Sequence, residues 1–328
     1  AALSDAPPGL VAVGHRVVFG GARFTAPTLI DDGVIAALEE QGGVAPLHNA
    51  AAVALIREAR AALPDLPHVA VFDTAFHAGL PDEAAVYAVP AEWMTRWDVR
   101  RHGFHGLSVE WATGRAAAML GGPVPRLVVC HIGGGASPDG VRSGRSVDTS
   151  MGFSPLEGLV MATRSGSLDP GVVLHLITHE GMAPEEVRRM LNQDSGLLAL
   201  AGTRDMREVE ARAARGDRDA RLALDVHDHR LAATVASLAA ALGGLDAVVF
   251  TGGVGEGSAR VRAEIARRLA FLGLAVDPAL NAGPDGDADV SAPSAPVRTI
   301  VVRSREEMVI AGAARAALTV PPTTGGHP

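Results

Sequence analysis

The chain has 328 residues, 48% of them hydrophobic, and a formal net charge of −8. This length predicts two domains, and the negative charge argues against nucleic acid or an anionic membrane as a partner. All 29 basic residues are arginine, which excludes both a phosphate-loop lysine and a Schiff-base lysine. The only cysteine, Cys130, lies in an apolar run. We therefore expect a buried thiol and a reducing, cytoplasmic setting.

The first half of the chain predicts alternating strands and helices. Apolar runs and helical spacing indicate, in chain order, a strand over 11–18, helices over 31–41 and 49–63, and a strand over 68–72. A further helix is expected over 108–120, with Ser108 as its N-cap. Together with 38 glycines and 4% aromatic residues, this alternation predicts an α/β fold.

Two later segments resemble each other and indicate nucleotide binding. An expected strand over 126–131 leads into a turn at Gly133-Gly134-Gly135, and another over 246–251 leads into a glycine-rich turn over 252–257. Glycine lets a phosphate approach the backbone closely, and the helix expected from residue 259 favours negative charge at its N-terminus. One such segment is a weak signal, whereas two indicate a duplicated core that holds a nucleotide.

The rest of the chain predicts a long helix over 217–242, a strand over 300–302, a helix over 306–317 and a disordered tail over 321–328. His227 and His229 are two residues apart, so on a helix they point in different directions. We expect them to be surface or packing residues rather than metal ligands. The longest apolar stretch, 231–250, is interrupted by two glycines and is interpreted as a helix end, a turn and a strand, not as a membrane span. Residues 1–10 lack a signal-peptide pattern.

An ordered series of short motifs resembles the acetate kinase family. The motifs follow one another from about residue 11 to residue 318, and they are Gly14 to Val18, Ala45 to Asn49, Val71 to His77, Gly103 to Gly106, Val147 to Gly152, Pro155 to Gly158, Thr163 to Gly166 and Phe250 to Glu256. Each motif alone is weak, but the ordered set is specific.

The resemblance implies the fold shared by actin, hexokinase and the heat-shock chaperone ATPases, in which two ribonuclease H-like domains close over a cleft. It places residues 1–75 and 306–320 in a first domain that carries the acyl-substrate residues. Residues 76–305 form a second domain that binds nucleotide and is expected to make a homodimer. The family's amino-terminal Asn-x-Gly-Ser-Ser-Ser-x-Lys loop has no counterpart here. We therefore expect a truncated first domain whose sheet has an unpaired edge.

The resemblance also implies an activity, the reversible transfer of phosphate from ATP to acetate, which gives acetyl phosphate and ADP and uses Mg²⁺. Asp73, His105 and Arg164 match the family's catalytic residues, and Glu306 matches a magnesium-associated glutamate. The acyl-substrate residues of the family correspond to Arg16, Val18, Leu47, His48, Phe104 and Pro155. Its nucleotide-binding residues correspond to His131, Gly133, Gly134, Gly135, Asp205, Met206, Arg207, Gly253, Val254, Gly255, Glu256 and Gly257.

The chemistry of such a reaction favours fixed cations. A carboxylate acceptor is already an anion at neutral pH, so the difficulty is to bring two anions together and to stabilise the transferring phosphoryl group. By resemblance, Arg16 holds the carboxylate, Arg164 stabilises the transition state and His105 donates to phosphoryl oxygens. We expect Asp73 to orient an arginine or the metal, because the substrate has no proton to remove.

Two alternatives stay open. The absent loop, and Gly134 in place of the family's asparagine, would also fit a non-catalytic nucleotide-binding homologue. A propionate or butyrate kinase is the other alternative. Val18 suits a short acyl chain, but one methylene gives only about 10- to 200-fold discrimination.

Overall fold

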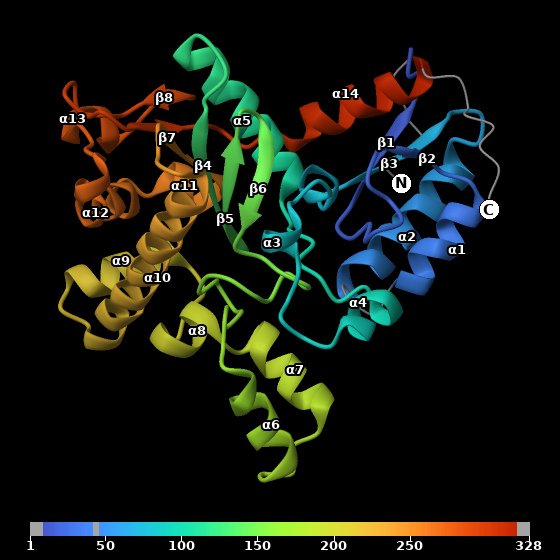
Figure 1. Ribbon diagram of the computed structural model, residues 1–328, viewed down its shortest axis with the longest axis horizontal. Coiled ribbons are helices and arrows are strands. Elements are labelled where there is room, and N and C mark those ends of the chain that lie inside the picture. The colour runs from blue at the N-terminus through green and yellow to red at the C-terminus, as the bar shows by residue number, and fades with distance from the viewer. Residues whose placement is uncertain (1–8, 42–45, 320–328) are drawn as a thin grey trace.

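The computed structural model describes residues 9–41 and 46–319, with side chains for all of them except residues 46–48. Figure 1 shows a small sheet with its helices at one side of the molecule and a larger sheet in the middle. The small sheet has β3 (His68–Phe72) at its centre, paired in parallel with β1 (Val13–Val17) and antiparallel with β2 (Thr28–Leu29). The expected strand over 68–72 is confirmed.

Both faces of the small sheet are covered by helices. On one face, α1 (Asp32–Glu40) and α2 (Pro46–Ala62) pack on the sheet and bury an apolar cluster that includes Leu38, Ile56 and Phe72. On the other face, α14 (Glu306–Thr319) packs on β1 and β3. Within the part of the chain that the structure describes, no strand pairs with the second edge of β1.

The larger sheet has the strand order β6-β5-β4-β7-β9-β8. Its strands are β4 (Arg126–Ile132), β5 (Ala136–Arg142), β6 (Arg145–Thr149), β7 (Ala247–Thr251), β8 (Ala288–Asp289) and β9 (Arg298–Val301). Strands β4, β5 and β6 pair antiparallel to one another. On the other side of β4, β7 pairs with it in parallel, and β9 pairs in parallel with β7. This is the ribonuclease H-like order, so the α/β prediction is confirmed.

The apolar run of β4 is buried on both faces, as expected for a central strand. Leu127 and Val129 belong to the cluster under α5 (Gly106–Leu120), whereas Val128 and Cys130 face the cluster under α10 (Arg218–Leu242) and α12 (Ala259–Arg268). The Cys130 side chain is fully buried, and burial raises the pKa of its thiol. The expectation of a buried thiol is confirmed.

Two local predictions are wrong. The N-cap of α5 is His105, and Ser108 lies inside the helix, where its hydroxyl bonds to His131 Nδ1 at 2.8 Å. The helix begins earlier because the Gly106 N–H donates to the Asp73 carbonyl at 2.8 Å, and a side chain at Gly106 would collide with that carbonyl. The glycine-rich run 252–257 is the short helix α11 (Gly252–Gly257), not a turn.

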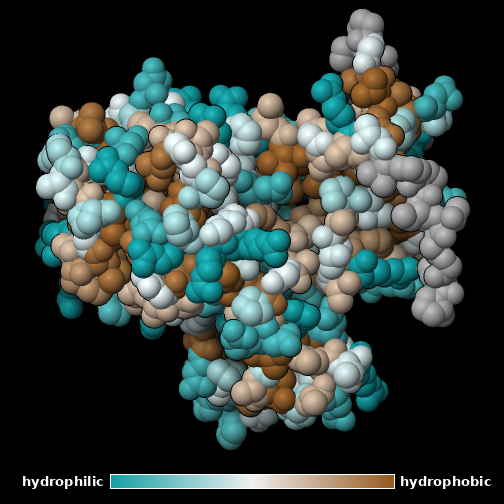
Figure 2. Space-filling view, turned by 45° about the horizontal axis from the view of Figure 1, so that its top comes forward, coloured by the Kyte–Doolittle hydropathy of each residue, from teal (hydrophilic) through white to brown (hydrophobic). Residues whose placement is uncertain are grey.

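The remaining elements lie mainly at the periphery. They are η2 (Ala75–His77), α3 (Asp82–Ala85), α4 (Ala91–Trp97), α6 (Pro170–Thr178), α7 (Pro184–Gln193), α8 (Gly196–Ala201), α9 (Met206–Ala214), η3 (Ala270–Leu272) and α13 (Pro278–Ala282). Helices α6 and α7 project from the body of the molecule, and Figure 2 shows hydrophobic patches on this projection. Val172 and Leu174 of α6 are exposed there.

Several broader predictions lie beyond what the fold tests. The domain limits near residues 75 and 306 and the homodimer stay predictions. The expected disordered tail, 321–328, lies outside the described residues. Among the described helices, none combines the length and apolarity that crossing a membrane requires.

Candidate active site

Arg16 and Asp73 form a two-point ion pair where two parallel strands end. Arg16 Nε donates to Asp73 Oδ1 at 2.9 Å, and its Nη2 donates to Oδ2 at 2.7 Å. The pair forms because β1 and β3 run in parallel, which places Arg16 beside the residue that follows β3. Asp73 is 1% exposed and Arg16 is 39% exposed, so part of the guanidinium remains accessible to solvent. The sequence-based expectation that Asp73 orients an arginine agrees with this geometry.

Glu306, the first residue of α14, lies on the same guanidinium. Its Oε2 is 2.6 Å from Arg16 Nη1. Burial alone would lower the pKa of Arg16, but the two carboxylates raise it overall. Burial raises the pKa of Glu306, and Arg16 opposes that shift. The three groups sum to one negative charge if all are ionised, so Asp73 and Glu306 together more than neutralise Arg16.

The segment Gly103 to Gly106 brings His105 to the same place. His105 has φ of 55°, a left-handed conformation that is unusual for a residue with a side chain. Gly103 packs against the His77 ring, where a side chain would not fit, and Gly106 is held to the Asp73 carbonyl. The His105 ring stacks on His131, with centroids 4.3 Å apart. Neither Gly103 nor Gly106, on the two sides of His105 in the sequence, could carry a side chain in this arrangement.

The two arginines that the sequence nominates converge on His105. Burial, followed by His131, Arg16 and Arg164, holds the pKa of His105 well below its usual range. Arg164 also approaches Gly135, whose missing side chain would lie 3.4 Å from Arg164 Nη1 and 3.2 Å from His105 Nε2. Arg164 and His105, which are far apart in the chain, therefore lie beside the same glycine, and Arg16 is near enough to lower the pKa of His105.

Arg164 differs from Arg16 in lacking a carboxylate partner among the described residues. Its Nη1 donates to the Pro155 carbonyl at 3.1 Å and contacts Met161 Sδ at 3.8 Å. In the described ranges, 9–41 and 46–319, no carboxylate lies within ion-pair distance of it, and burial lowers its pKa. Arg164 is therefore a half-buried cation whose charge is available to an incoming anion.

A cavity of about 810 Å³ opens next to Arg164. Its lining includes Arg164 and nine of the residues expected to bind nucleotide, which are Gly133, Gly134, Gly135, Asp205, Met206, Arg207, Gly253, Val254 and Gly257. Both strand-plus-glycine segments therefore face one space, as the sequence predicts. The volume is in the range of small-molecule and cofactor sites.

Three of the residues expected to bind nucleotide do not line this cavity. His131 lies behind it, bonded to Ser108. The Gly255 carbonyl accepts from Arg262 Nη1 at 2.9 Å. The Glu256 carboxylate accepts from the Gly252 N–H at 3.0 Å and the Ser304 N–H at 2.9 Å. All three support the cavity wall from behind.

The acyl-substrate residues are only partly described. Phe104 is buried and stacks on Phe19 at 6.4 Å, and Val18 packs against the same cluster. Pro155 is half-buried and holds Arg164 through its carbonyl. The side chains of Leu47 and His48 lie outside the described residues. The acyl slot therefore stays a prediction.

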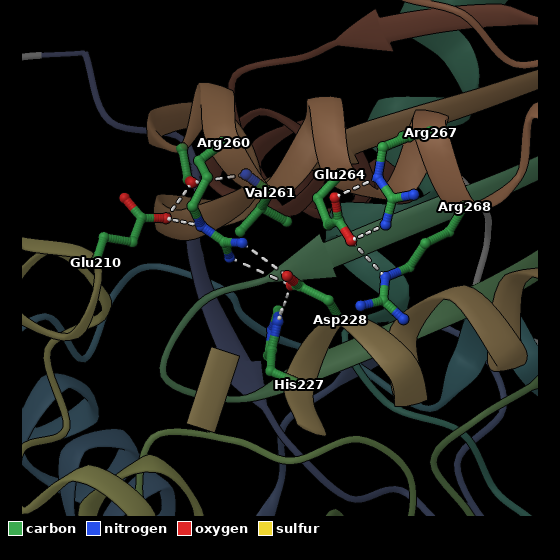
Figure 3. A network of polar contacts seen from close by, with 9 residues as sticks. Glu210, His227, Asp228, Arg260, Val261, Glu264, Arg267 and Arg268 are labelled. Carbon is green, nitrogen blue, oxygen red and sulfur yellow. Dashed lines mark hydrogen bonds and ion pairs between the residues drawn. The ribbon is translucent and has the colours of Figure 1, made fainter. Parts of the chain in front are cut away.

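His227 also lines the cavity, although the sequence suggested only a surface or packing role. Its Nδ1 is 3.0 Å from Asp228 Oδ1, and Arg260 Nη1 donates to Asp228 Oδ2 at 2.6 Å. Arg260 Nε in turn donates to Glu210 Oε1 at 3.1 Å. Figure 3 shows this network where α9, α10 and α12 meet. His229 is exposed, and within the described chain no cluster of three or more potential ligands could hold a metal.

The model of the acetokinase family matches residues 3–312 of the chain. The chain belongs to the acetokinase family. An acetate kinase of Deinococcus radiodurans is 52% identical over 305 residues, which cover 92% of this chain and 76% of that protein. An acetate kinase of Streptomyces avermitilis is 50% identical over 308 residues, with 93% and 76% covered.

Solved acetokinase structures share the fold. An acetate kinase of Porphyromonas gingivalis superposes with a TM-score of 0.89 at 38% identity, over 96% of this chain and 80% of that one. A propionate kinase of Francisella tularensis superposes with a TM-score of 0.89 at 40% identity, over 93% and 79%. The family resemblance on which the sequence-based predictions depend is therefore confirmed.

Besides His227, the sequence analysis missed two residues that lie next to His105 in the candidate site of this acetokinase. Ser137 and Asp139 are two apart on β5, so they share one face of the strand, and both are fully buried. Ser137 Oγ lies 2.9 Å from His105 Nδ1. The sequence signal that could have found them is a serine and an aspartate two residues apart, directly after the first glycine-rich segment.

Proposed function

We propose that this acetokinase is an acetate kinase, which transfers the terminal phosphoryl group of ATP reversibly to acetate and gives acetyl phosphate and ADP. The observation that carries the proposal is Arg164, a half-buried cation without a carboxylate partner among the described residues, placed between the glycine-lined cavity and His105. A fixed cation at this point stabilises charge that develops on the phosphoryl group.

The two reactants have separate places in this proposal. The nucleotide occupies the cavity, with its phosphates at Gly133 to Gly135 and the Arg164 end. The carboxylate of acetate lies against the exposed part of the Arg16 guanidinium, and its methyl group faces Val18 and Phe104. Arg16 holds one anion, Arg164 meets the other, and the neutral His105 ring lies where they join.

Magnesium fits the carboxylates of this site. Mg²⁺ in kinases is bound through one or two carboxylates together with substrate phosphates. Asp73 and Glu306 supply two such carboxylates on one guanidinium. These two residues would hold the ion, which supplies charge neutralisation for the phosphate oxygens when it is bound. We also infer a cytoplasmic homodimer, supported by the buried single cysteine and the exposed apolar residues of α6.

The test is acetate-dependent release of ADP from MgATP by the purified protein. Arg164→Ala is expected to lower kcat about 10³-fold or more, with added guanidinium restoring part of the loss. Arg267→Ala, which removes a 69% exposed arginine of α12, is the matched control and should leave kcat unchanged. Calorimetry with MgATP distinguishes this proposal from a non-catalytic nucleotide-binding homologue. If the wild type binds MgATP but shows no acetate-dependent turnover, the proposal is wrong.

A further inference from the structure

A buried carboxylate lies directly behind His105, with one serine between them. Ser137 Oγ is 2.9 Å from His105 Nδ1 and 3.0 Å from Asp139 Oδ2. Thr149 Oγ1 donates to the other oxygen, Asp139 Oδ1, at 2.5 Å. Asp139 and Ser137 have no exposed surface. An uninterrupted chain of polar atoms therefore connects the interior of the larger sheet to the ring that faces the cleft.

No cation within the described chain balances Asp139. The one basic atom within ion-pair distance in that part of the chain is His77 Nε2 at 3.9 Å, but this nitrogen bonds to the Phe104 carbonyl, so its proton points there. His77 is neutral, because burial lowers its pKa to about 4. Asp148 on β6 adds negative charge nearby, and the buried thiol of Cys130 on β4 adds none. A buried carboxyl without a cation is stable in its protonated form.

The protonation of Asp139 sets the direction of every hydrogen bond in the chain of polar atoms. Burial raises the pKa of Asp139 to about 8, so it holds a proton at neutral pH. Thr149 donates to Oδ1. Ser137 Oγ donates to Oδ2 when Asp139 is ionised, and an acid proton on Oδ2 reverses the direction of this contact. The Ser137 hydroxyl accepts that proton's hydrogen bond and donates its own to His105 Nδ1. The neutral His105 ring then carries its proton on Nε2.

His105 Nε2 faces the reacting centre. It lies 3.2 Å from the point where Gly135 would bear a side chain, with Arg164 Nη1 at 3.4 Å from the same point. The groups around the ring are His131, Arg16, Arg164 and His77, and with burial they keep His105 neutral. A proton on Nε2 makes this nitrogen a donor, whereas a bare Nε2 would present a lone pair to an anion.

We propose that protonated Asp139 acts through Ser137 as a positioning residue that holds His105 in the tautomer with its proton on Nε2, ready to donate to the transferring phosphoryl group. This inference rests on the proposed phosphoryl transfer. When Asp139 loses its proton, the Ser137 hydroxyl turns to the carboxylate and accepts from His105 Nδ1–H. Nε2 then becomes an acceptor that faces the phosphoryl oxygens, and catalysis slows.

The kinetic test compares kcat from pH 6 to pH 9.5 in wild type and Asp139→Asn. The side-chain amide of this variant can donate to Ser137 at every pH while its oxygen accepts from Thr149. We expect the wild-type kcat to fall with a midpoint near pH 8, and the Asp139→Asn variant to keep its neutral-pH kcat within about threefold and lose this decline. Ser137→Ala should be slow at all pH values, because nothing then fixes the tautomer. An equal decline in wild type and Asp139→Asn would overturn the proposal.

A second measurement does not depend on turnover. Nitrogen-15 spectra of histidine-labelled protein report which ring nitrogen is protonated, and His105→Gln identifies the His105 signals by their loss. We expect Nε2–H at pH 7 in wild type and in Asp139→Asn, and Nδ1–H at pH 9.5 in wild type alone. An Nδ1–H signal in wild type at pH 7 would contradict the proposal. If the wild type shows no acetate-dependent turnover, the proposed function fails, while these spectra still decide the role of Asp139.

Discussion

Asp73 accepts two hydrogen bonds from the Arg16 guanidinium, at 2.9 and 2.7 Å, and is itself almost fully buried. The pair fixes the plane of the fork, and Glu306 contacts the remaining nitrogen, Nη1, at 2.6 Å. The geometry matters more than the charge alone, because a bidentate pair sets an orientation that a single contact cannot.

Asp73→Asn should therefore lower kcat/KM for acetate by about 10²-fold. The amide NH₂ of the variant opposes an N–H of Arg16, so the guanidinium loses its fixed plane. Steady-state kinetics with varied acetate measure the effect. The matched control is Asp246→Asn. Asp246 pairs in the same bidentate way with Arg126, which begins β4 and lies outside the candidate site. If both variants keep wild-type kinetics, orientation of Arg16 is not what Asp73 supplies.

Val18→Ala should shift selectivity toward propionate. Val18 follows β1 and packs against the cluster that contains Phe104, so its truncation leaves room for one further methylene. The ratio of kcat/KM for propionate to that for acetate is expected to rise about tenfold. Val17→Ala is the control, because Val17 packs in the separate core of the small sheet. A ratio that rises equally in both variants would show that the slot lies elsewhere.

Arg260→Ala should destabilise the protein. The variant leaves Asp228, which is 2% exposed, without its two guanidinium bonds, while His227 remains beside it. Arg260 is one-third exposed, so we expect a loss of about 1–3 kcal/mol in the free energy of unfolding. Urea unfolding measures this loss. Arg267→Ala, from the exposed pair with Glu264 on the same helix, should change it by less than about 0.5 kcal/mol.

Asp139 should make stability fall as the solution becomes more alkaline. The folded protein keeps a proton on Asp139 up to about pH 8, whereas the unfolded chain releases it near its ordinary pKa of 3.8. The unfolded state therefore binds fewer protons between these values, and stability decreases as pH rises. Relative to Asp139→Asn, the wild type should lose roughly 1.4 kcal/mol per pH unit across this window. Parallel stability profiles for the two proteins from pH 5 to pH 8 would contradict this account.

Local patterns in the sequence were enough for five strands, β1, β3, β4, β7 and β9, and for the positions of the two glycine-rich segments. They missed β2, β5, β6 and β8, which are short or carry polar residues, proline and glycine. The run from His68 to Phe72 is apolar after its first residue and is a buried strand between two others. The cavity lined by both glycine segments follows from parallel pairing of β4 and β7, whose carboxyl ends lie side by side. Predictions of this kind depend on periodicity and strand direction, which the chain carries locally.

Contacts between distant residues were not predictable in the same way. Arg16 pairs with Glu306 across most of the chain, and the resemblance suggested only a metal role for that glutamate. In the sequence, His227 has the features of an ordinary helix residue. Its polar network depends on Glu210 of α9 and Arg260 of α12, which only the folded structure brings next to α10. The ionisation of Asp139 depends on the groups that surround it in three dimensions, which no spacing in the sequence encodes.

Glu256 connects two segments of the chain that are far apart in sequence. One carboxylate oxygen accepts both the Gly252 N–H, at the start of the glycine segment, and the Ser304 N–H, two residues before Glu306. The start of α11, which borders the cavity, and the segment just before Glu306 are thus bonded to the same carboxylate oxygen. Loss of this carboxylate in Glu256→Ala would therefore free both segments at once, the start of α11 and the residues that lead into α14.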